Sequence, residues 1–500
     1  MMQIVRGGRV VGPAGRRADH ADILIDGDTI REIGPPGMPA AHAVEIDATG
    51  RLLMPGLVNA HTHGHANLSK GAGDRWTLEL MQNALAGLTG RRTAEDKALA
   101  TRIGAVEMVR KGCTAAYDLA FEYPGPTGEG IAAAAQAYAD VGMRAVVAPM
   151  IWERTLYEVV PGLMDALPDA LRREAERFAL PPADASLEAL EAMLRDWPFD
   201  RAQVRPAVAP TIPSFCSDDL LVRLGNLARD YGVGFHTHLS ESKVQAVAAR
   251  TMHERSATAH LADLGILSPV FTAAHAVWVD AEDLSRLADS GSSVAHNPGS
   301  NARLGNGIAP VRDMLDRGIN VAIGTDSCTC SDNQNVFEAM RIASFMIRVQ
   351  EVDPARWPTA EEILGMATEG GARALGFEGE IGALVPGRKA DIVFLDLGAP
   401  HYVPLNDALN QIVYAEDGTG VDSVMIGGRF VMRDRAMTTV DEARLKEDAQ
   451  RAVERLYDDA NRIVRDRVSA LEADLARRCL ALLRAPYPVE RHAHLGLREA

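Results

Sequence analysis

Short apolar runs in the middle of the chain alternate with amphipathic stretches, and most of these runs end in a polar residue. The stretches between the runs carry helix signals, such as Ser217-Asp-Asp, which is typical of a helix N-terminus. Strands that alternate with helices indicate a parallel sheet, and eight strands close a barrel. We therefore expect an α/β fold, a (β/α)8 TIM barrel. The predicted strands lie at about 53–60, 113–119, 144–151, 204–210, 233–239, 270–277, 292–296 and 319–325.

The two ends of the chain have a different pattern, of short strands separated by turns. Asp26-Gly27 is a strong hairpin signal, and similar strand-rich stretches return at 387–396 and 421–431. We predict a small β-sandwich domain formed from both chain ends. The predicted domains are 1–55 plus 380–440 for this β-sandwich, 56–379 for the catalytic barrel and 441–500 for a C-terminal helical extension.

Two other segments are expected to be helical. The insertion at about 152–200, after the third strand, is expected to wall or cover the barrel mouth. From about 440 the apolar residues recur at spacings of three and four, which predicts an amphipathic helix or helix pair. We expect these helices to pack on the barrel exterior, with a dimer contact as the alternative, and expect the protein to be a homodimer.

The composition is that of an ordinary globular protein of 500 residues. A formal charge of −16 disfavours nucleic acid and anionic membrane surfaces as partners, because both would repel the chain. No stretch has the length and hydrophobicity of a signal peptide or of a membrane span. The five cysteines are scattered and odd in number, which indicates a reducing compartment. We therefore expect a cytoplasmic protein.

Polar residues gather at the ends of the predicted strands, where a barrel of this kind keeps its active site. Histidines two positions apart at a strand end face the same way, so both imidazoles can reach one ion. Three imidazoles and one carboxylate suit a borderline divalent ion such as zinc, with room left for water. The residues at these strand ends are His61 and His63, His238, His275, and Asp326.

Several longer motifs around these residues carry a resemblance to a known family. They lie at 54–63, 111–115, 236–241, 274–280, 296–301, 307–311, 324–327 and 382–391. Together they resemble the amidohydrolase superfamily, specifically the branch of guanine and 8-oxoguanine deaminases, S-adenosylhomocysteine deaminases and triazine hydrolases. The resemblance extends over almost the whole chain and is more specific for the superfamily than for a substrate.

The resemblance implies one divalent metal ion, zinc or, with the same ligands, iron. Its ligands fall on His61, His63, His238 and Asp326. In the family, one ligand stands three residues before the glutamate that corresponds to position 241, and this spacing selects His238. His236 is the alternative ligand. If His238 binds the metal, we expect His236 to have a structural or supporting role. The end of the fourth strand has no lysine, which favours a single metal over a binuclear site.

The chemistry implied by the family assigns roles to three residues. Asp326 accepts a proton from the attacking water, and His275 orients this nucleophile and stabilises developing charge. Glu241 protonates a ring nitrogen of the substrate and helps to move protons to the leaving amine. Hydrolytic deamination of a heterocycle needs such an acid.

Five residues are expected to face the substrate. His65 and Asn67 follow the first strand, where the family contacts its substrate, and Trp76 is expected to stack on a heterocycle or to pack as helix core. Thr211 stands where S-adenosylhomocysteine deaminases carry a histidine, and its segment is closer to 8-oxoguanine deaminases, which disfavours a nucleoside. Asn301 is expected to contact the substrate or to support a neighbouring ligand.

The expected partner is a small heterocyclic substrate. We predict hydrolytic deamination of an amino-substituted N-heterocycle of purine, pterin, pyrimidine or triazine type, with release of ammonia. The alternative is hydrolysis of another C–N or C–Cl bond at the same site, as in dealkylamination or dechlorination of a triazine, or of an amide or urea. A non-catalytic relative is disfavoured because every expected ligand and both proton-handling residues are present.

Overall fold

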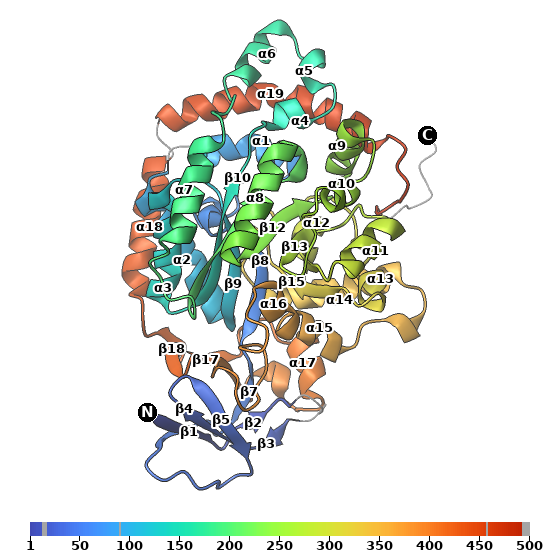
Figure 1. The fold of residues 1–500 in the computed structure, drawn as a ribbon. Coiled ribbons are helices and arrows are strands. Elements are labelled where there is room, and N and C mark those ends of the chain that lie inside the picture. The colour runs from blue at the N-terminus through green and yellow to red at the C-terminus, as the bar shows by residue number, and fades with distance from the viewer. Residues whose placement is uncertain (13–17, 90–91, 457–458, 493–500) are drawn as a thin grey trace.

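The computed structural model describes residues 1–12, 18–89, 92–456 and 459–492. Its centre is one sheet of eight parallel strands that follow one another in chain order, which confirms the predicted barrel (Figure 1). The sheet closes where the N–H of Asp326 donates to the carbonyl of His61 at 2.8 Å, beside an isolated bridge between Thr62 and Asp326. The strands are β8 (Leu57–Thr62), β9 (Cys113–Ala120), β10 (Arg144–Ile151), β11 (Val204–Pro210), β12 (Gly234–Leu239), β13 (Phe271–His275), β14 (Ser293–His296) and β15 (Asn320–Ile323).

The first predicted strand was wrong, because the apolar run at 53–60 divides between two sheets. Strand β7 (Arg51–Pro55) pairs antiparallel with β16 (Ile392–Asp396) outside the barrel, and β8 begins only at Leu57. The chain passes from one sheet to the other at Gly56. A side chain does not fit there, because a Cβ at this position would lie 2.1 Å from Oγ1 of Thr114. Both strands are buried, so their hydrophobicity is continuous and the boundary leaves no mark in the sequence.

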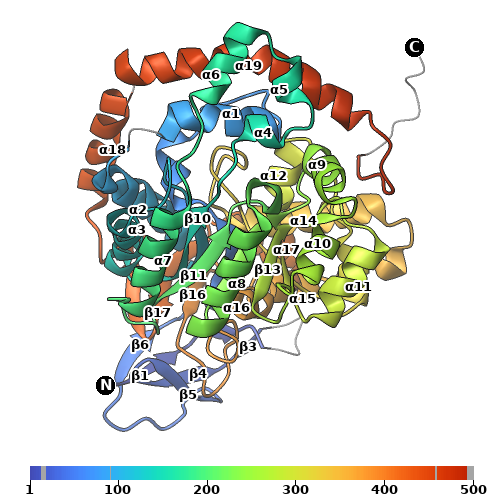
Figure 2. The same ribbon diagram turned by 45° about the horizontal axis from the view of Figure 1, so that its top comes forward.

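Helices surround the barrel and fill its connections (Figure 2). The helix signals have clear structural counterparts: the side chain of Ser217 accepts from the N–H of Leu220, and Thr93 forms a capping box with Asp96. The helices that follow strands of the barrel are α1 (Leu78–Thr89), α2 (Ala94–Arg110), α3 (Gly128–Val141), α8 (Asp218–Tyr231), α9 (Lys243–His253), α10 (Ala257–Asp263), α11 (Ala281–Asp289), α12 (Pro298–Arg303), α13 (Val311–Asp316), α14 (Val336–Gln350), α15 (Ala360–Met366) and α16 (Glu369–Ala374).

The insertion after β10 is helical and reaches the mouth of the barrel, as expected. It contains α4 (Leu156–Val159), α5 (Leu163–Ala166), α6 (Asp169–Glu176) and α7 (Asp184–Arg195). Helices α5 and α6 stand at the top of the molecule in Figure 1, at the end of the barrel where the strands finish. Side chains from this insertion line the cavity there, so the insertion forms part of the wall around the barrel mouth.

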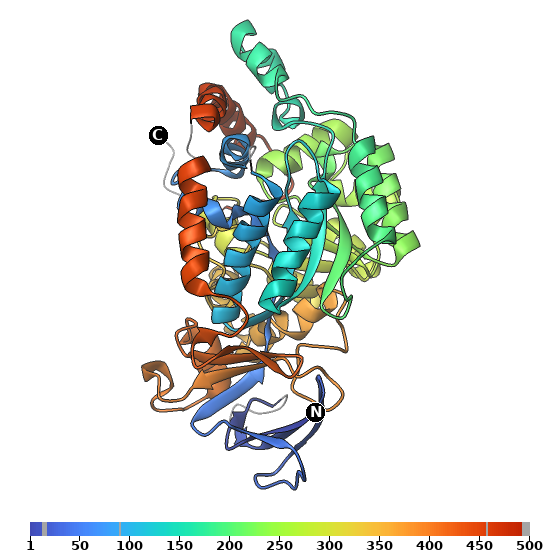
Figure 3. The same cartoon turned by 90° about the vertical axis from the view of Figure 1, so that its left-hand side faces the viewer.

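Two further sheets lie at the opposite end of the barrel, one built from N-terminal strands alone and the other from both chain ends (Figure 3). One sheet has the order β5-β4-β1-β6 and the other β19-β18-β17-β16-β7-β2-β3, with a shared apolar core that includes Ile25, Leu53 and Phe394. The strands are β1 (Met2–Arg6), β2 (Arg9–Val10), β3 (Asp19–His20), β4 (Asp22–Asp26), β5 (Thr29–Gly34), β6 (Val44–Asp47), β17 (Val421–Ile426), β18 (Arg429–Arg433) and β19 (Ala436–Met437), and α17 (Ala408–Tyr414) lies between β16 and β17.

The C-terminal extension is a helix pair whose two members lie in different places. Helix α18 (Glu442–Leu456) runs along the outside of the barrel against α2, as expected (Figure 3). Helix α19 (Asp459–Leu483) instead crosses the mouth end over α1, where Nδ2 of Asn83 donates to the carbonyl of Val468 at 2.9 Å (Figures 1 and 2). The expectation of exterior packing is therefore wrong for α19. Within the described ranges, no helix combines the length and hydrophobicity that crossing a membrane requires.

Candidate metal centre and substrate pocket

The predicted metal and catalytic residues meet at the mouth of the barrel. His61 lies at the end of β8, His238 near the end of β12, His275 at the end of β13, and Asp326 just beyond β15. His275 and Asp326 have φ values of 70° and 63°, in the left-handed region that non-glycine residues seldom occupy. Such strained backbone turns are frequent at functional sites, and here they lie at the rim where the strands end.

Four of these residues bring their donor atoms close enough for one cation. Nε2 of His63 lies 3.2 Å from Nε2 of His238, and Oδ1 of Asp326 lies 3.3 Å from Nε2 of His63. The same Oδ1 atom lies 3.6 Å from Nε2 of His61. The donor atoms of His61, His63 and His238 all lie within 4.8 Å of one another. Three nitrogens and one oxygen at this separation match the ligands that a borderline divalent metal prefers.

The hydrogen bonds of the imidazoles leave their metal-facing nitrogens free. Nδ1 of His63 contacts the carbonyl of Leu119 at 2.8 Å, and Nδ1 of His238 contacts the carbonyl of Thr211 at 2.6 Å. With the Nδ1 atoms occupied by these carbonyls, the Nε2 atoms of His63 and His238 are turned toward each other, where neutral imidazoles would offer both lone pairs to a cation. His61 is fully buried with no hydrogen-bond partner on either nitrogen. The residues therefore fit a bound divalent cation.

Burial favours the neutral form of His61 and His238, which is the form that binds metal, whereas at His63 the effect of burial is outweighed by the contact with Asp326, which raises its pKa. Burial lowers the pKa of His238 to about 3, helped by the neighbouring His63 and His275. Burial also holds the pKa of His61 well below its ordinary value, although Asp326 acts in the opposite direction. A neutral imidazole keeps a lone pair for the cation.

His236, the alternative ligand, lies beside His61, with ring centroids 5.0 Å apart, but its nitrogens do not converge with the other donor atoms. Its ring packs edge-on against Tyr117, with centroids 4.4 Å apart, and its two nitrogens are buried without partners. Neither group of donor atoms at the barrel mouth includes His236, whereas His238 belongs to one of them and lines the pocket. The geometry supports His238 as the ligand.

His275 is held by two asparagines that follow β14. Its Nδ1 lies 2.9 Å from Oδ1 of Asn301, and Nδ2 of Asn297 lies 3.3 Å from its Nε2. Asn301 can only accept through Oδ1, so the proton sits on Nδ1 and Nε2 is the acceptor. Nε2 also lies 3.6 Å from Oε2 of Glu241 and 3.7 Å from Oδ2 of Asp326. His275 thus stands between the two carboxyl groups, in one fixed tautomer.

The two carboxyl groups have opposite tendencies to ionise. Burial raises the pKa of Glu241 well above its ordinary value, and the nearby Asp326 and Glu79 raise it further. Burial alone would also raise the pKa of Asp326, but a hydrogen bond with His63 and the charges of nearby histidines hold it well below its ordinary value. A pair of acids with separated pKa values can divide the roles of proton donor and proton acceptor.

Two polar contacts around Glu241 were not predicted from the sequence. Nδ2 of Asn306 donates to Oε1 of Glu241 at 3.0 Å. Ser242 follows Glu241 in the chain, and its Oγ donates to Oε1 of Glu79 at 2.6 Å. Burial raises the pKa of Glu79. A glutamate in an amphipathic helix normally faces solvent, so the sequence carries no signal that Glu79 is buried beside the site.

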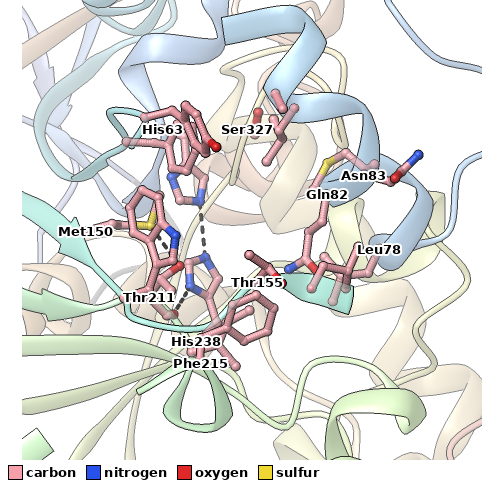
Figure 4. Close-up of a pocket in the computed structure, with 18 of the residues that line it drawn as sticks. His63, Leu78, Gln82, Asn83, Met150, Thr155, Thr211, Phe215, His238 and Ser327 are labelled. Atoms are coloured by element: carbon pink, nitrogen blue, oxygen red, sulfur yellow. Dashed lines mark hydrogen bonds between the residues drawn. The ribbon is translucent and has the colours of Figure 1, made fainter. Parts of the chain in front are cut away.

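A cavity opens above the proposed metal ligands, and two of the five expected substrate-facing residues line it (Figure 4). His65 and Thr211 line it. Asn67 and Trp76 do not: Nδ2 of Asn67 donates to the carbonyl of Gly64 at 2.9 Å, and Trp76 packs against a small apolar cluster at the start of α1. Asn301 is likewise outside the lining and contacts His275.

Most of the pocket wall comes from segments that no sequence motif marked. Gln82 extends from α1 into the space facing His63 and His238, and it makes no hydrogen bond with any residue that the structure describes (Figure 4). Aromatic residues complete the wall; Phe121 and Trp152 stack with centroids 4.9 Å apart and planes at 9°. Their hydrophobicity resembles that of ordinary core, which is why the sequence alone did not distinguish them.

The chain is similar to known proteins over most of its length. A model described as the amidohydrolase family matches residues 52–431. A 5-methylthioadenosine/S-adenosylhomocysteine deaminase of Syntrophobacter fumaroxidans is 35% identical, over 86% of this chain and 92% of the relative. A 5′-deoxyadenosine deaminase of Methanosarcina mazei is 32% identical, over 87% of this chain and 93% of the relative.

Solved structures with the same architecture agree with these similarities. An adenosine deaminase of Xanthomonas campestris with bound zinc superposes with a TM-score of 0.81 at 26% identity, covering 91% of this chain and 98% of that structure. An atrazine chlorohydrolase of Arthrobacter aurescens complexed with zinc also has a TM-score of 0.81, at 25% identity, covering 90% of this chain and 99% of that structure. Both of these solved structures hold zinc, and the donor set of this chain fits a divalent metal.

Proposed function

Because this chain belongs to the amidohydrolase family, and is thus a hydrolase of C–N bonds, we propose that it deaminates an amino-substituted N-heterocycle and releases ammonia. The observation that carries this proposal is the position of Glu241. It is a buried acid with a raised pKa, 3.6 Å from His275 and on the cavity side of the metal donor set. Breaking a C–N bond on an aromatic ring needs a proton donor at this place, because the ring must be activated and the amine must leave as ammonia.

We propose that His61, His63, His238 and Asp326 bind one zinc ion. The convergent nitrogens support this set, and so do the zinc-containing structures similar to this chain. Iron accepts the same ligands, and metal analysis of the purified protein distinguishes the two. When bound, the cation lowers the pKa of a water molecule toward neutrality and so provides a nucleophile.

The proposed proton path runs between the two carboxyl groups. Asp326 accepts a proton from the attacking water, and His275, in the tautomer fixed by Asn301, accepts a hydrogen bond that orients this water. Glu241 donates its proton to a ring nitrogen, which makes the neighbouring carbon electrophilic. The water oxygen forms a bond to this carbon, and the proton held by Asp326 passes to the exocyclic nitrogen, whose bond to carbon breaks as ammonia leaves. The remaining proton of the former water returns to Glu241, which restores the acid and leaves the oxo product with its protonated ring nitrogen.

The names of the relatives support a purine-like ring as the substrate, since both relatives described above are deaminases of adenosine derivatives. Thr211 lines the pocket beside His238, so a feature in which the chain departs from S-adenosylhomocysteine deaminases lies next to the substrate. The second candidate is cleavage of a C–N or C–Cl bond of a triazine, which is supported by the similarity to an atrazine chlorohydrolase.

The test is a screen of the zinc-loaded protein for ammonia release from aminopurines, adenosine derivatives, aminopterins, aminopyrimidines and aminotriazines. We expect ammonia and the corresponding oxo product from at least one of these rings. Deamination would be overturned if none of these rings released ammonia while the protein hydrolysed amides or ureas. It would also be overturned if none released ammonia while the protein released chloride or alkylamine from triazines. A protein that takes up no stoichiometric divalent metal would instead support a non-catalytic scaffold.

We also propose that the protein is a cytoplasmic homodimer. All five cysteines are free and buried, which supports a reducing compartment.

The support for a dimer is a group of exposed apolar residues at the end of α14 and just beyond it. Phe345, Val349 and Val352 are 48%, 70% and 93% exposed and follow one another at helical spacing. An exposed apolar group of this kind supports a protein contact. Light scattering after size-exclusion chromatography measures the molar mass and so tests the dimer. We expect the mass of a dimer for the native protein and that of a monomer for Val349→Glu.

A further inference from the structure

The cavity above the metal centre has two chemically different ends. Its inner end holds the proposed ligands and Glu241, where the amine to be removed must lie. Its outer end is formed by α1 and by the insertion after β10, through side chains that include Leu78, Leu85, Phe178 and Leu180. The part of a substrate that lies beyond the reacting ring is therefore surrounded by the outer end.

Several polar groups of the outer wall bind other protein groups, whereas the side chain of Gln82 makes no such contact with the described residues. The hydroxyl of Tyr157 donates to Oδ1 of Asn83 at 2.8 Å, and Nδ2 of Asn83 donates to the carbonyl of Val468. Oγ1 of Thr155 donates to Oε2 of Glu158 at 2.8 Å. A substituent that enters this end therefore meets hydrocarbon and aromatic carbon, since most of the polar atoms nearby already have partners inside the protein.

Among the described residues that line the cavity, a single side chain is strongly basic. Arg154 is the one lysine or arginine among the lining residues, all of which lie in the described part of the chain. Its Nη1 donates to the carbonyls of Ser214 and Cys216, each at 3.3 Å, which ties the guanidinium to the loop after β11. The two acids of the lining, Glu241 and Asp326, lie at the metal centre. A phosphate or a zwitterion that lies against Phe178 and Leu180 would lose its hydration beside hydrocarbon and aromatic carbon.

We propose that the pocket selects an aminoheterocycle that carries an uncharged, apolar substituent, which packs against Phe178 and Leu180. The proposal rests on the proposed deamination for the identity of the ring, but the preference for the substituent follows from the wall alone. One relative is named for both 5-methylthioadenosine, which is uncharged, and the zwitterionic S-adenosylhomocysteine, and the proposal selects the first kind of substituent for this chain.

The experiment compares pairs of substrates with the same ring, of which one member carries an uncharged apolar substituent and the other a charged one. On the purine ring the pair is 5′-deoxyadenosine and adenosine 5′-monophosphate. On every other ring that releases ammonia it is an alkyl and a carboxyalkyl derivative of equal length. We expect kcat/KM to be at least about tenfold higher for the uncharged member, because an unpaired charge is excluded from an apolar site. Equal values, or a preference for the charged member, would overturn the proposal.

Binding separates this proposal from the proposed function. The same pairs are titrated by calorimetry into the zinc-loaded Glu241→Gln variant, which is expected to bind without turnover. A preference for the uncharged member in binding, without ammonia release by the native protein from any ring, would retain the selectivity and overturn the deamination. Ammonia release without a preference for the uncharged member would retain the deamination and overturn the selectivity. If no member of any pair binds and none is turned over, both the deamination and the selectivity would be overturned.

A substitution in the wall provides a direct control. Phe178→Lys introduces a cation at the outer end, so the discrimination against the phosphate is expected to fall by about threefold or more. Phe199→Lys makes the same change at a similarly half-buried aromatic of the same insertion, which packs on Trp197 outside the cavity. We expect this control to keep the native ratio; a fall in both variants would contradict the role of Phe178.

Discussion

The backbone N–H of Asp326 donates to the carbonyl of His61 at 2.8 Å, and this contact between two proposed ligands also closes the barrel. Oδ1 of Asp326 lies 3.6 Å from Nε2 of His61, so the same two residues meet again through their side chains. The positive φ of Asp326, 63°, turns the chain at this point. The spacing of the metal donors is therefore set by the closure of the sheet itself, which is a rigid element.

Removing one proposed ligand is expected to have a different effect from removing the proposed acid. His238→Ala deletes a metal donor, so both the bound zinc and ammonia release should be lost. Glu241→Gln keeps the donor set and removes the transferable proton, so the metal should remain while kcat falls by about 10²–10⁴-fold. Elemental analysis and an ammonia assay on both variants check this. Near-normal turnover by Glu241→Gln would refute the assigned role of Glu241.

Asn301 is expected to act through His275, although it lies outside the pocket. Asn301→Ala removes the acceptor that fixes the Nδ1 proton of His275, so the imidazole loses its orientation and its tautomer. We expect kcat to fall about 10–100-fold, with KM and metal content near native values. The conservative Asn301→Asp keeps an acceptor oxygen and should recover part of kcat. An effect confined to KM would instead indicate direct contact with the substrate.

Gln82 is expected to contribute to substrate binding and not to chemistry. It faces His63 and His238 across the cavity and has no hydrogen-bond partner in the described part of the protein (Figure 4). Gln82→Leu removes its donor and acceptor at similar volume. We expect KM to rise by about fivefold, as for the loss of one neutral hydrogen bond of about 1 kcal/mol, with kcat within about twofold. Steady-state kinetics with the best substrate of the screen measure both, and an unchanged KM would contradict this assignment.

Glu79 is expected to make the stability of the protein depend on pH. Burial raises its pKa, so the folded chain retains this proton to a higher pH than the unfolded chain. Unfolding then releases a proton between the two pKa values, and the contribution of Glu79 to the free energy of unfolding decreases as pH rises through that interval. Glu79→Gln keeps an oxygen that accepts from Ser242 and abolishes the titration.

The measurement is urea unfolding of native protein and Glu79→Gln at about pH 5 and about pH 8. We expect the variant to gain stability relative to the native protein as pH increases. Glu95→Gln, at an exposed position of the next helix, controls for the change in net charge. A constant difference between Glu79→Gln and the native protein across this range would mean that Glu79 ionises alike in both states.

The barrel and the family could be recognised from the sequence because their signals are local. Each strand is a short apolar run that ends in a polar residue, and the motifs around His61, His238 and Asp326 are contiguous. The error at the first strand arose where this local signal fails. Residues 51–55 and 57–62 are both buried, and only pairing with partners far along the chain assigns β7 to one sheet and β8 to another.

The sequence by itself determined the number of barrel strands, the polar residues at their ends and the kinds of donor atom that they offer. Tertiary structure alone decided which of these side chains meet, that Asn301 contacts His275 while Asn67 binds backbone, and that Glu79 is buried beside Glu241. It also placed α19 and the insertion after β10 around the cavity. The physical reason is that donor chemistry and hydrophobic periodicity belong to a residue and its neighbours in the chain. Burial, distance and pKa depend on segments that come together only when the sheet closes.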